Sequence, residues 1–153
     1  MQKPRVVILS AFLSPFRSGA EACVEEVAGR LSDRYDITIV TAKLSKLSGV
    51  SFQLIGGIGV RVIRVGIGCS FDKWLFPFLA PFVVRRRKPD IVHAVLETFA
   101  GAALLLCRWV YPRARRILTL QTTNRSFLKC PIIRSAQKVT AISSVLVDAA
   151  KRC

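Results

Sequence analysis

Short apolar runs rich in Val, Ile and Leu recur along the chain and alternate with longer segments. Runs of four to eight such residues are typical of buried β-strands. Six strands are expected, at residues 5–10, 36–42, 59–66, 91–95, 115–121 and 137–143. The loop-rich stretch 43–57 has room for a further short strand at 50–55. Residues 59–66 alternate apolar and polar positions, which favours a strand at the edge of a sheet.

The segments between these runs have helical character. Apolar residues at Cys23, Val27 and Leu31 recur every four positions and predict a helix that begins near Gly19. Residues 71–87 predict a helix that breaks or bends near its two prolines, because proline cannot donate a backbone hydrogen bond. Further helices are expected at 98–110 and from Ser143 or Ser144, as an N-cap, to about residue 152.

Alternating strands and helices indicate the fold class. Strands that are apolar on both sides are typical of a parallel sheet covered by helices on both faces. We therefore predict a doubly wound, Rossmann-like α/β fold in a single domain, for which 153 residues suffice. The last predicted helix has no strand after it, so we expect the domain to be incomplete at its C-terminus.

The charge balance limits the kinds of partner that the chain can attract. The chain has 24 Lys and Arg against 9 Asp and Glu, a net charge of +15, which attracts anions. The aromatic residues of 74–82 stand just before the basic run 85–88, an order that would let the segment lie on an anionic membrane surface. The alternative is an amphipathic core helix with a basic end. No nucleic-acid-binding motif is present, which argues against DNA or RNA.

Cysteine usage bears on metals and on redox state. Five cysteines occur, at positions 23, 69, 107, 130 and 153. No CxxC pair is present and there is one histidine, so we expect no metal site. The odd count and wide spacing predict reduced thiols in a cytoplasmic protein. The first apolar run is expected to be a strand and not a signal peptide.

Candidate binding residues follow from the expected sheet, since ligands bind beyond the carboxyl ends of parallel strands. Ser18 and Gly19 open the first helix, where free N–H groups can hold a donor phosphate; the alternative is a plain turn with Ser18 as N-cap. The polar stretch 121–125, which includes Gln121 and Thr122, suits sugar hydroxyls or phosphate; the alternative is a solvated loop.

His93, the single histidine, is the candidate for acid–base chemistry. It stands near the end of an apolar strand and could orient or deprotonate a hydroxyl, with Glu97 as the nearest carboxylate. The alternative is a histidine bonded to a backbone carbonyl at a strand end, and the residue taken alone favours this alternative.

Four segments taken in order resemble a known family. They are SGAEACVEEVAGRLSDRYDITIVTA, KPDIVHAVLETFAGAALLLCR, RRILTLQTTN and SAQKVTAISSVLVDAAKR. Their motifs, order and spacing are similar to the N-terminal domain of GT-B glycosyltransferases of the family-4 type. Such enzymes have two Rossmann-like domains, of which the N-terminal one mainly holds the acceptor and the C-terminal one most of the nucleotide-sugar. The resemblance implies that 1–153 is the acceptor-side half of a GT-B fold, without the donor-binding domain.

The chain departs from the family pattern at three positions. Ser18 replaces the first glycine of a pair, Val95 replaces a second histidine, and Gln121 replaces the histidine after the next strand. His93 matches a family histidine that is more often structural than catalytic. The resemblance implies that Ser18 and Gly19 lie at the donor phosphate. It also implies that Gln121, Thr122 and Glu97 lie at the acceptor, and it leaves the catalytic residue unassigned.

The implied activity is transfer of a sugar from a nucleotide-sugar, as co-substrate and without a metal, to an acceptor hydroxyl. A lipid-linked or phosphorylated acceptor on the inner face of the membrane suits the charge. We expect the chain alone to be inactive. Two alternatives stay open. One is a non-catalytic binding subunit that recruits a separate donor-domain chain to the membrane. The other is a truncated, nonfunctional product.

Overall fold

The computed structural model describes residues 3–13, 19–46, 50–55, 58–123 and 126–153. Within these ranges one sheet has the strand order β3-β4-β2-β1-β5-β6-β7. Its strands are β1 (Arg5–Leu9), β2 (Asp36–Ala42), β3 (Val50–Ile55), β4 (Ile58–Val65), β5 (Ile91–Val95), β6 (Arg115–Leu120) and β7 (Lys138–Ala141). All neighbours pair in parallel except β3 and β4, which form an antiparallel hairpin. The predicted α/β fold is confirmed.

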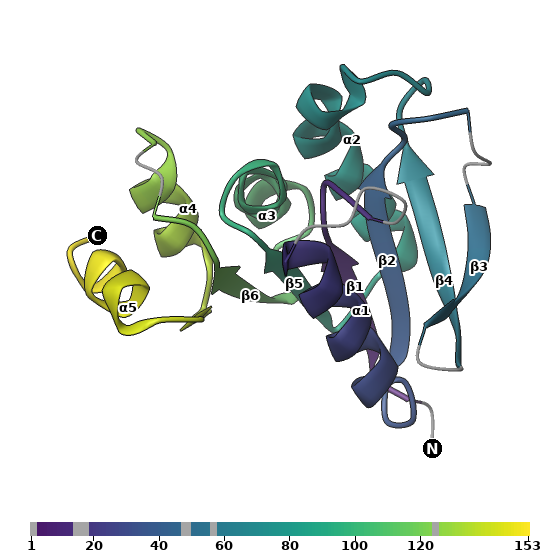
Figure 1. Cartoon of the computed structure of the whole chain (residues 1–153), viewed down its shortest axis with the longest axis horizontal. Helices are drawn as coiled ribbons and strands as arrows, with labels where there is room; N and C mark the ends of the chain where they lie inside the picture. The colour runs from purple at the N-terminus through teal and green to yellow at the C-terminus, as the bar shows by residue number, and fades with distance from the viewer. Residues whose placement is uncertain (1–2, 14–18, 47–49, 56–57, 124–125) are drawn as a thin grey trace.

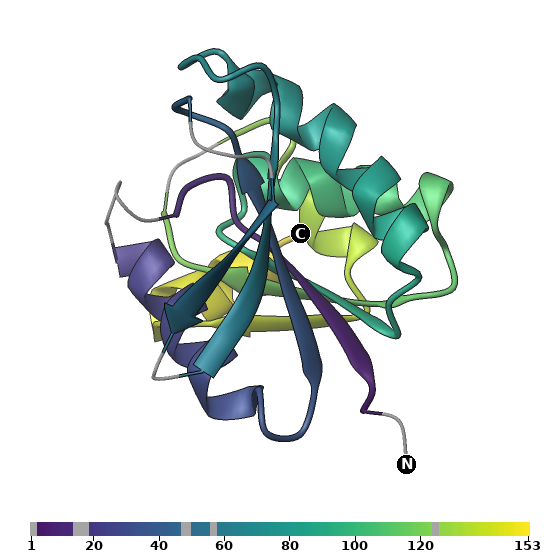
Figure 2. The same cartoon turned by 90° about the vertical axis from the view of Figure 1, so that its right-hand side faces the viewer.

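Helices cover the sheet on both faces (Figures 1 and 2). They are α1 (Gly19–Leu31), α2 (Asp72–Arg87), α3 (Phe99–Val110), α4 (Lys129–Ser135) and α5 (Ser144–Lys151). Val24 and Ala28 of α1 pack against the β1–β2–β4 side of one face. On the other face α2, α3 and α4 pack in one core around Leu9, Leu118 and neighbouring strand residues. The inner strands β1 and β2 are therefore buried from both sides, as their composition predicts, whereas β7 at one edge of the sheet stays partly exposed.

The strand order defines where a ligand would bind. From β1 the chain runs outward to β2 and β4 on one side, and then crosses back to β5, β6 and β7 on the other. The direction of winding reverses between β1 and β5, and beyond their carboxyl ends such sheets have a crevice. We call the loops at this edge of the sheet, residues 10–13, 96–98 and 121–123, the rim.

Three details differ from the sequence-based expectations. Strand β4 lies inside the sheet and not at its edge, because β3 pairs with it on the outer side. Helix α2 runs unbroken through Pro77 and Pro81, and both prolines are buried, so packing against the core offsets the lost backbone hydrogen bonds. Helix α4 lies in a stretch for which no helix was predicted. No helix in the described part of the chain is long and apolar enough to span a membrane.

Candidate functional site

Glu97 is the centre of the rim. Its side chain is buried, and its carboxylate accepts hydrogen bonds from the backbone N–H groups of Gln121 at 3.0 Å and Thr122 at 3.2 Å. The ammonium group of Lys129 lies 3.3 Å from the same carboxylate and donates to the carbonyl oxygen of Thr122 at 2.9 Å. One carboxylate therefore connects the end of β5, the end of β6 and the start of α4.

Two local features position this centre. Leu96, the residue before Glu97, has a φ of 77°, a conformation that is strained for a branched side chain and that turns the chain sharply at the end of β5. Gly101 of α3 lies against α4, and a Cβ there would be 2.7 Å from the side chain of Ile132. Because glycine allows this close approach, α4 comes near enough to place Lys129 beside Glu97.

Gln121 and Thr122 have half-buried side chains next to this ion pair. The backbone of both is fixed by Glu97, so their side chains are presented from an ordered turn. The amide of Gln121 can donate and accept hydrogen bonds, as can the hydroxyl of Thr122. The structure therefore brings the predicted residues Glu97, Gln121 and Thr122 together at one place on the rim.

His93 belongs to a different group of side chains. Its Nε2 lies 2.8 Å from the hydroxyl oxygen of Thr119, which lies 2.8 Å from the hydroxyl oxygen of Thr140. Burial lowers the pKa of His93 to about 4, so the imidazole is neutral near pH 7. The partner is a threonine hydroxyl and not the backbone carbonyl that the sequence-based alternative named. The chain of hydrogen bonds connects β5, β6 and β7 across the sheet.

Aromatic side chains lie at the β1 side of the rim. The Phe99 ring, at the start of α3, makes edge contacts with Phe12 at 6.4 Å and with Trp74 at 5.1 Å between ring centroids. Phe12 is in the loop after β1 and Trp74 is in the first turn of α2. An apolar contact therefore runs from the loop beyond β1 to the outer helix α2. The positions of the aromatic residues in the sequence did not predict that Phe12 and Phe99 lie at the rim.

The predicted phosphate site is described only in part. Gly19 is exposed at the first position of α1, and a Cβ built on it would meet no atom within 4 Å. Packing among the described residues therefore does not demand glycine here. Ser18 lies outside the described residues. No cluster of His, Cys, Asp and Glu in the described ranges could hold a metal ion.

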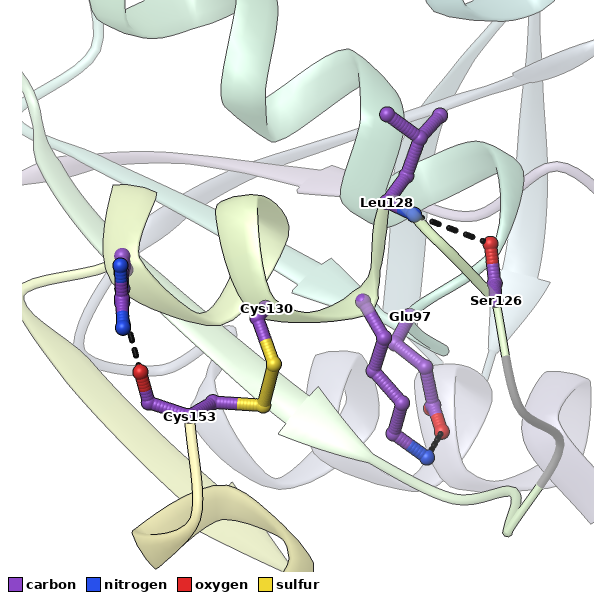
Figure 3. Close-up of a disulfide and its surroundings, with 7 residues drawn as sticks. Glu97, Ser126, Leu128, Cys130 and Cys153 are labelled. Atoms are coloured by element: carbon purple, nitrogen blue, oxygen red, sulfur yellow. Dashed lines mark hydrogen bonds and ion pairs between the residues drawn. A yellow bond between two sulfur atoms is a disulfide. The ribbon is translucent and has the colours of Figure 1, made fainter.

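A disulfide between Cys130 and Cys153 corrects the prediction that all the cysteines are reduced (Figure 3). It joins α4 to the residues after α5, 23 positions apart, and the wide spacing that suggested free thiols is bridged by the fold. Free thiols are found at Cys23, Cys69 and Cys107. Burial raises the pKa of Cys107 to about 12, so this thiol stays protonated.

Lys129, at the start of α4, is the partner of Glu97 that sequence reasoning missed. It is next to Cys130, and its ammonium group lies 3.3 Å from the Glu97 carboxylate. In the sequence Lys129 is one lysine in a basic stretch for which no helix was predicted, and this gave no reason to place it near Glu97.

A separate pocket of about 360 Å³, lined in part by Lys3, Tyr35 and Arg61, lies at the opposite end of the strands.

Comparison with known proteins bears on the family and the fold of the chain. Residues 17–153 match the family model for Glycosyltransferase Family 4. A search among curated proteins finds no match. The fold resembles sucrose-phosphate synthase from Thermosynechococcus elongatus, with a TM-score of 0.73, 12% identity, and coverage of 98% of this chain and 45% of that one.

A second solved structure, Acinetobacter baumannii MurG, gives a TM-score of 0.59 at 14% identity, over 90% of this chain and 41% of that one. The chain thus spans less than half the length of these two enzymes. At such identities the likeness shows the fold, and the family model carries the assignment. On that match, the chain belongs to glycosyltransferase family 4.

Proposed function

We propose that the chain forms the acceptor-binding half of a glycosyltransferase that moves a sugar from a nucleotide-sugar to an acceptor hydroxyl. The observation that carries the proposal is the Glu97 centre, where a buried ion pair fixes the backbone that presents Gln121 and Thr122. A family-4 domain works with a sugar donor and an acceptor. This chain aligns with less than half of the length of each of the two larger enzymes, which supports the proposal that it forms one half of a catalytic unit.

The roles of the rim residues follow from their chemistry. Gln121 and Thr122 hydrogen-bond the acceptor hydroxyls. Glu97 fixes the backbone of these two residues through its hydrogen bonds and does not touch the acceptor. Glutamine cannot remove a proton near neutral pH, so Gln121 binds and does not act as a base. His93 is neutral and bonded to Thr119, which supports a structural role. The open N-terminus of α1 at Gly19 faces the donor phosphate.

The acceptor is lipid-linked or phosphorylated in this proposal. The aromatic contacts of Phe12, Phe99 and Trp74 provide an apolar wall beside the rim. The net charge of +15 attracts an anionic acceptor and the anionic inner face of a membrane. The nucleotide-sugar is the co-substrate, and its base is bound mainly by a second domain.

Acceptor binding tests the proposal at single residues. Octyl glucoside and glucose 6-phosphate serve as probes for the lipid-linked and phosphorylated classes, with affinity measured by calorimetry. Gln121→Ala should weaken the probe that binds by roughly tenfold, the effect of one lost hydrogen bond to a sugar. Gln53→Ala, on the β3–β4 hairpin, is the matched control and should leave affinity unchanged. Equal affinities of the two variants would contradict the proposed site.

Sugar transfer tests the proposed division of labour. The purified 153-residue chain should show negligible transfer with any nucleotide-sugar, because most donor contacts are proposed to lie elsewhere. Sustained transfer by this chain with no other protein would overturn the half-enzyme proposal.

A second candidate function, a binding subunit for a separate donor-domain chain, has support from exposed side chains. Ile142 and Val145, which follow the end of β7, are exposed, and so is Phe127, which follows the end of β6. Such apolar groups beside the rim suit contact with another polypeptide. Native purification should then give a complex of fixed stoichiometry with a chain of domain size, about 150 residues or more. Transfer by a single polypeptide would exclude this form.

A further inference from the structure

The outer face of α2 is an aromatic surface that the fold leaves uncovered. Large apolar side chains are exposed on it: Phe71 59%, Trp74 56%, Phe78 63% and Phe82 58%. Residues four apart lie above one another on a helix, so the last three form one stripe. The interpretation of 71–87 as an amphipathic core helix requires these rings to be buried. Of the aromatic residues in this helix only Phe76 is buried.

The buried side of α2 explains why the rings point outward. Phe76, Ala80 and Val84 pack in the core, and the two prolines are buried with them. Because this side is occupied, the remaining aromatic residues have no core position to take. A helix of a globular protein usually presents polar side chains outward. The aromatic stripe on α2 therefore needs a partner or an apolar phase.

Cations stand at the end of this stripe. Arg85 and Arg86 are exposed in the last turn of α2, and Lys88 follows them. The adjacent helix α3, which lies beside α2 in Figure 2, ends with Arg108 and Trp109, both exposed. The acid within α2, Asp72, is buried and accepts hydrogen bonds from the loop before the helix. The surface thus combines rings and cations without an exposed carboxylate from α2.

We propose that this surface, the outer face of α2 from Phe71 to Arg86, docks on an anionic lipid bilayer. Aromatic rings partition into the boundary between headgroups and acyl chains, and arginines bind the lipid phosphates there. The stripe from Trp74 to Phe82 is about 12 Å long, enough to contact more than one lipid. Two copies of the chain, each at +15, repel one another, which favours lipid over self-association.

Docking through α2 places the rim at the membrane. Helix α2 starts after β4, whose carboxyl end is on the same edge of the sheet as those of β1 and β5. Trp74 contacts Phe99, which contacts Phe12 beside the rim. This step rests on the proposed function: a lipid-linked acceptor would reach Gln121 while its chain stays in the bilayer.

Vesicle binding tests the surface without any sugar transfer. Sedimentation is measured with phosphatidylcholine vesicles that contain none or about 30% phosphatidylglycerol. Arg85→Gln/Arg86→Gln should weaken partitioning to the anionic vesicles roughly 30-fold, since each surface cation contributes roughly fivefold to the partition coefficient. Phe78→Ser/Phe82→Ser should weaken it by at least about tenfold. Both substitutions are at exposed positions, so folding should be unaffected.

Matched controls remove the same chemistry elsewhere. Phe52→Ser removes an exposed ring from the β3–β4 hairpin, and Arg34→Gln/Lys138→Gln removes two exposed charges away from α2. Both controls should bind anionic vesicles within about threefold of the parent, the effect of diffuse charge alone. If the controls lose as much binding as the α2 variants, or if the parent does not bind anionic vesicles, the proposal is overturned.

Tryptophan fluorescence gives a second, local readout. The chain has two tryptophans, so Trp109→Phe leaves Trp74 as the single reporter. Its emission should shift to shorter wavelength with anionic vesicles. An unchanged emission, or a dimer lost in Phe78→Ser/Phe82→Ser, would show that α2 faces water or a second copy instead. If the chain binds anionic vesicles but no acceptor binds at Gln121, the proposed function is contradicted and the proposed docking surface on α2 is supported.

Discussion

Two buried carboxylates at the same edge of the sheet, Asp72 at the first position of α2 and Glu97 in the loop after β5, make different contacts. Asp72 accepts N–H groups from Gly68 at 2.7 Å and Cys69 at 3.3 Å, at most four residues away. Glu97 accepts N–H groups from residues 24 and 25 positions away and pairs with Lys129. The Asp72 carboxylate therefore stabilises only the loop before its own helix. The Glu97 carboxylate instead connects three segments that are far apart in the sequence.

The loop before Asp72 packs closely around the Asp72 carboxylate. Gly66 has a φ of 127°, and a Cβ there would lie 2.2 Å from the Asp72 carboxyl carbon. Burial raises the pKa of Asp72, but hydrogen bonds from the backbone of Gly68, Ile67 and Cys69 outweigh it and hold the pKa below its usual value. The Glu97 centre has half-buried polar side chains beside it. The comparison separates a carboxylate that only closes its own loop from one that lies at the proposed binding site.

Removing the Glu97 carboxylate should have the largest effect. Glu97→Ala removes the carboxylate that pairs with Lys129 and accepts two backbone N–H groups, and we expect a loss of about 3–5 kcal/mol in the free energy of unfolding. Urea denaturation measures it. Lys129→Met should cost less in the Glu97→Ala background than in the parent, because the two are coupled. The control Glu26→Ala, in an exposed pair with Arg30, should cost under about 0.5 kcal/mol.

Opening the disulfide should affect one region and spare the other. Cys153→Ser removes a link across 23 residues and should lower the free energy of unfolding by about 3 kcal/mol. Because Cys130 is next to Lys129, amide signals of Gln121 and Thr122 should shift in NMR spectra. Signals of Gly68 and Cys69 should stay in place. Equal shifts in both loops would contradict the separation of the two regions.

The pH dependence of stability should separate His93 from Asp72. The folded pKa of His93, about 4, is below its unfolded value near 6.5, so the folded state resists protonation. The stabilisation is complete above pH 6.5 and is lost as the pH falls toward 4, by up to about 3 kcal/mol. In His93→Gln the fall between pH 6.5 and 4 should be shallower than in the parent. An identical slope would show that burial does not disfavour the charged imidazole.

Asp72 acts in a more acidic range and with a smaller effect. Its folded pKa is depressed, so its stabilisation is present above the unfolded pKa and is lost as the pH falls through the folded one, below about pH 4. Asp72→Asn should cost about 1–3 kcal/mol at pH 7, because charged hydrogen bonds become neutral ones. Its amide shifts should be confined to residues 66–72. Shifts at Gln121 would break the comparison.

The sequence predicts the sheet well and the rim only in part. Runs such as 36–42 and 91–95 are apolar on both sides, so the parallel core follows from composition. Helix α4 was missed because KCPIIRS is short, contains a proline and has no helical period, and Lys129 and the disulfide were missed with it. The sequence left two interpretations of 71–87 open, a membrane-surface segment and a core helix, because a segment that is apolar all round does not show which side packs inward.

The most direct test of the account is to map where an acceptor binds. Backbone amide signals of the chain are followed by NMR while octyl glucoside is added below its micelle-forming concentration. The account predicts shifts centred on Gln121 and Thr122 that disappear in Gln121→Ala and persist in Gln53→Ala. Shifts centred instead on the pocket of Lys3 and Arg61, or shifts unchanged by Gln121→Ala, would contradict the claim that the Glu97 rim is an acceptor site.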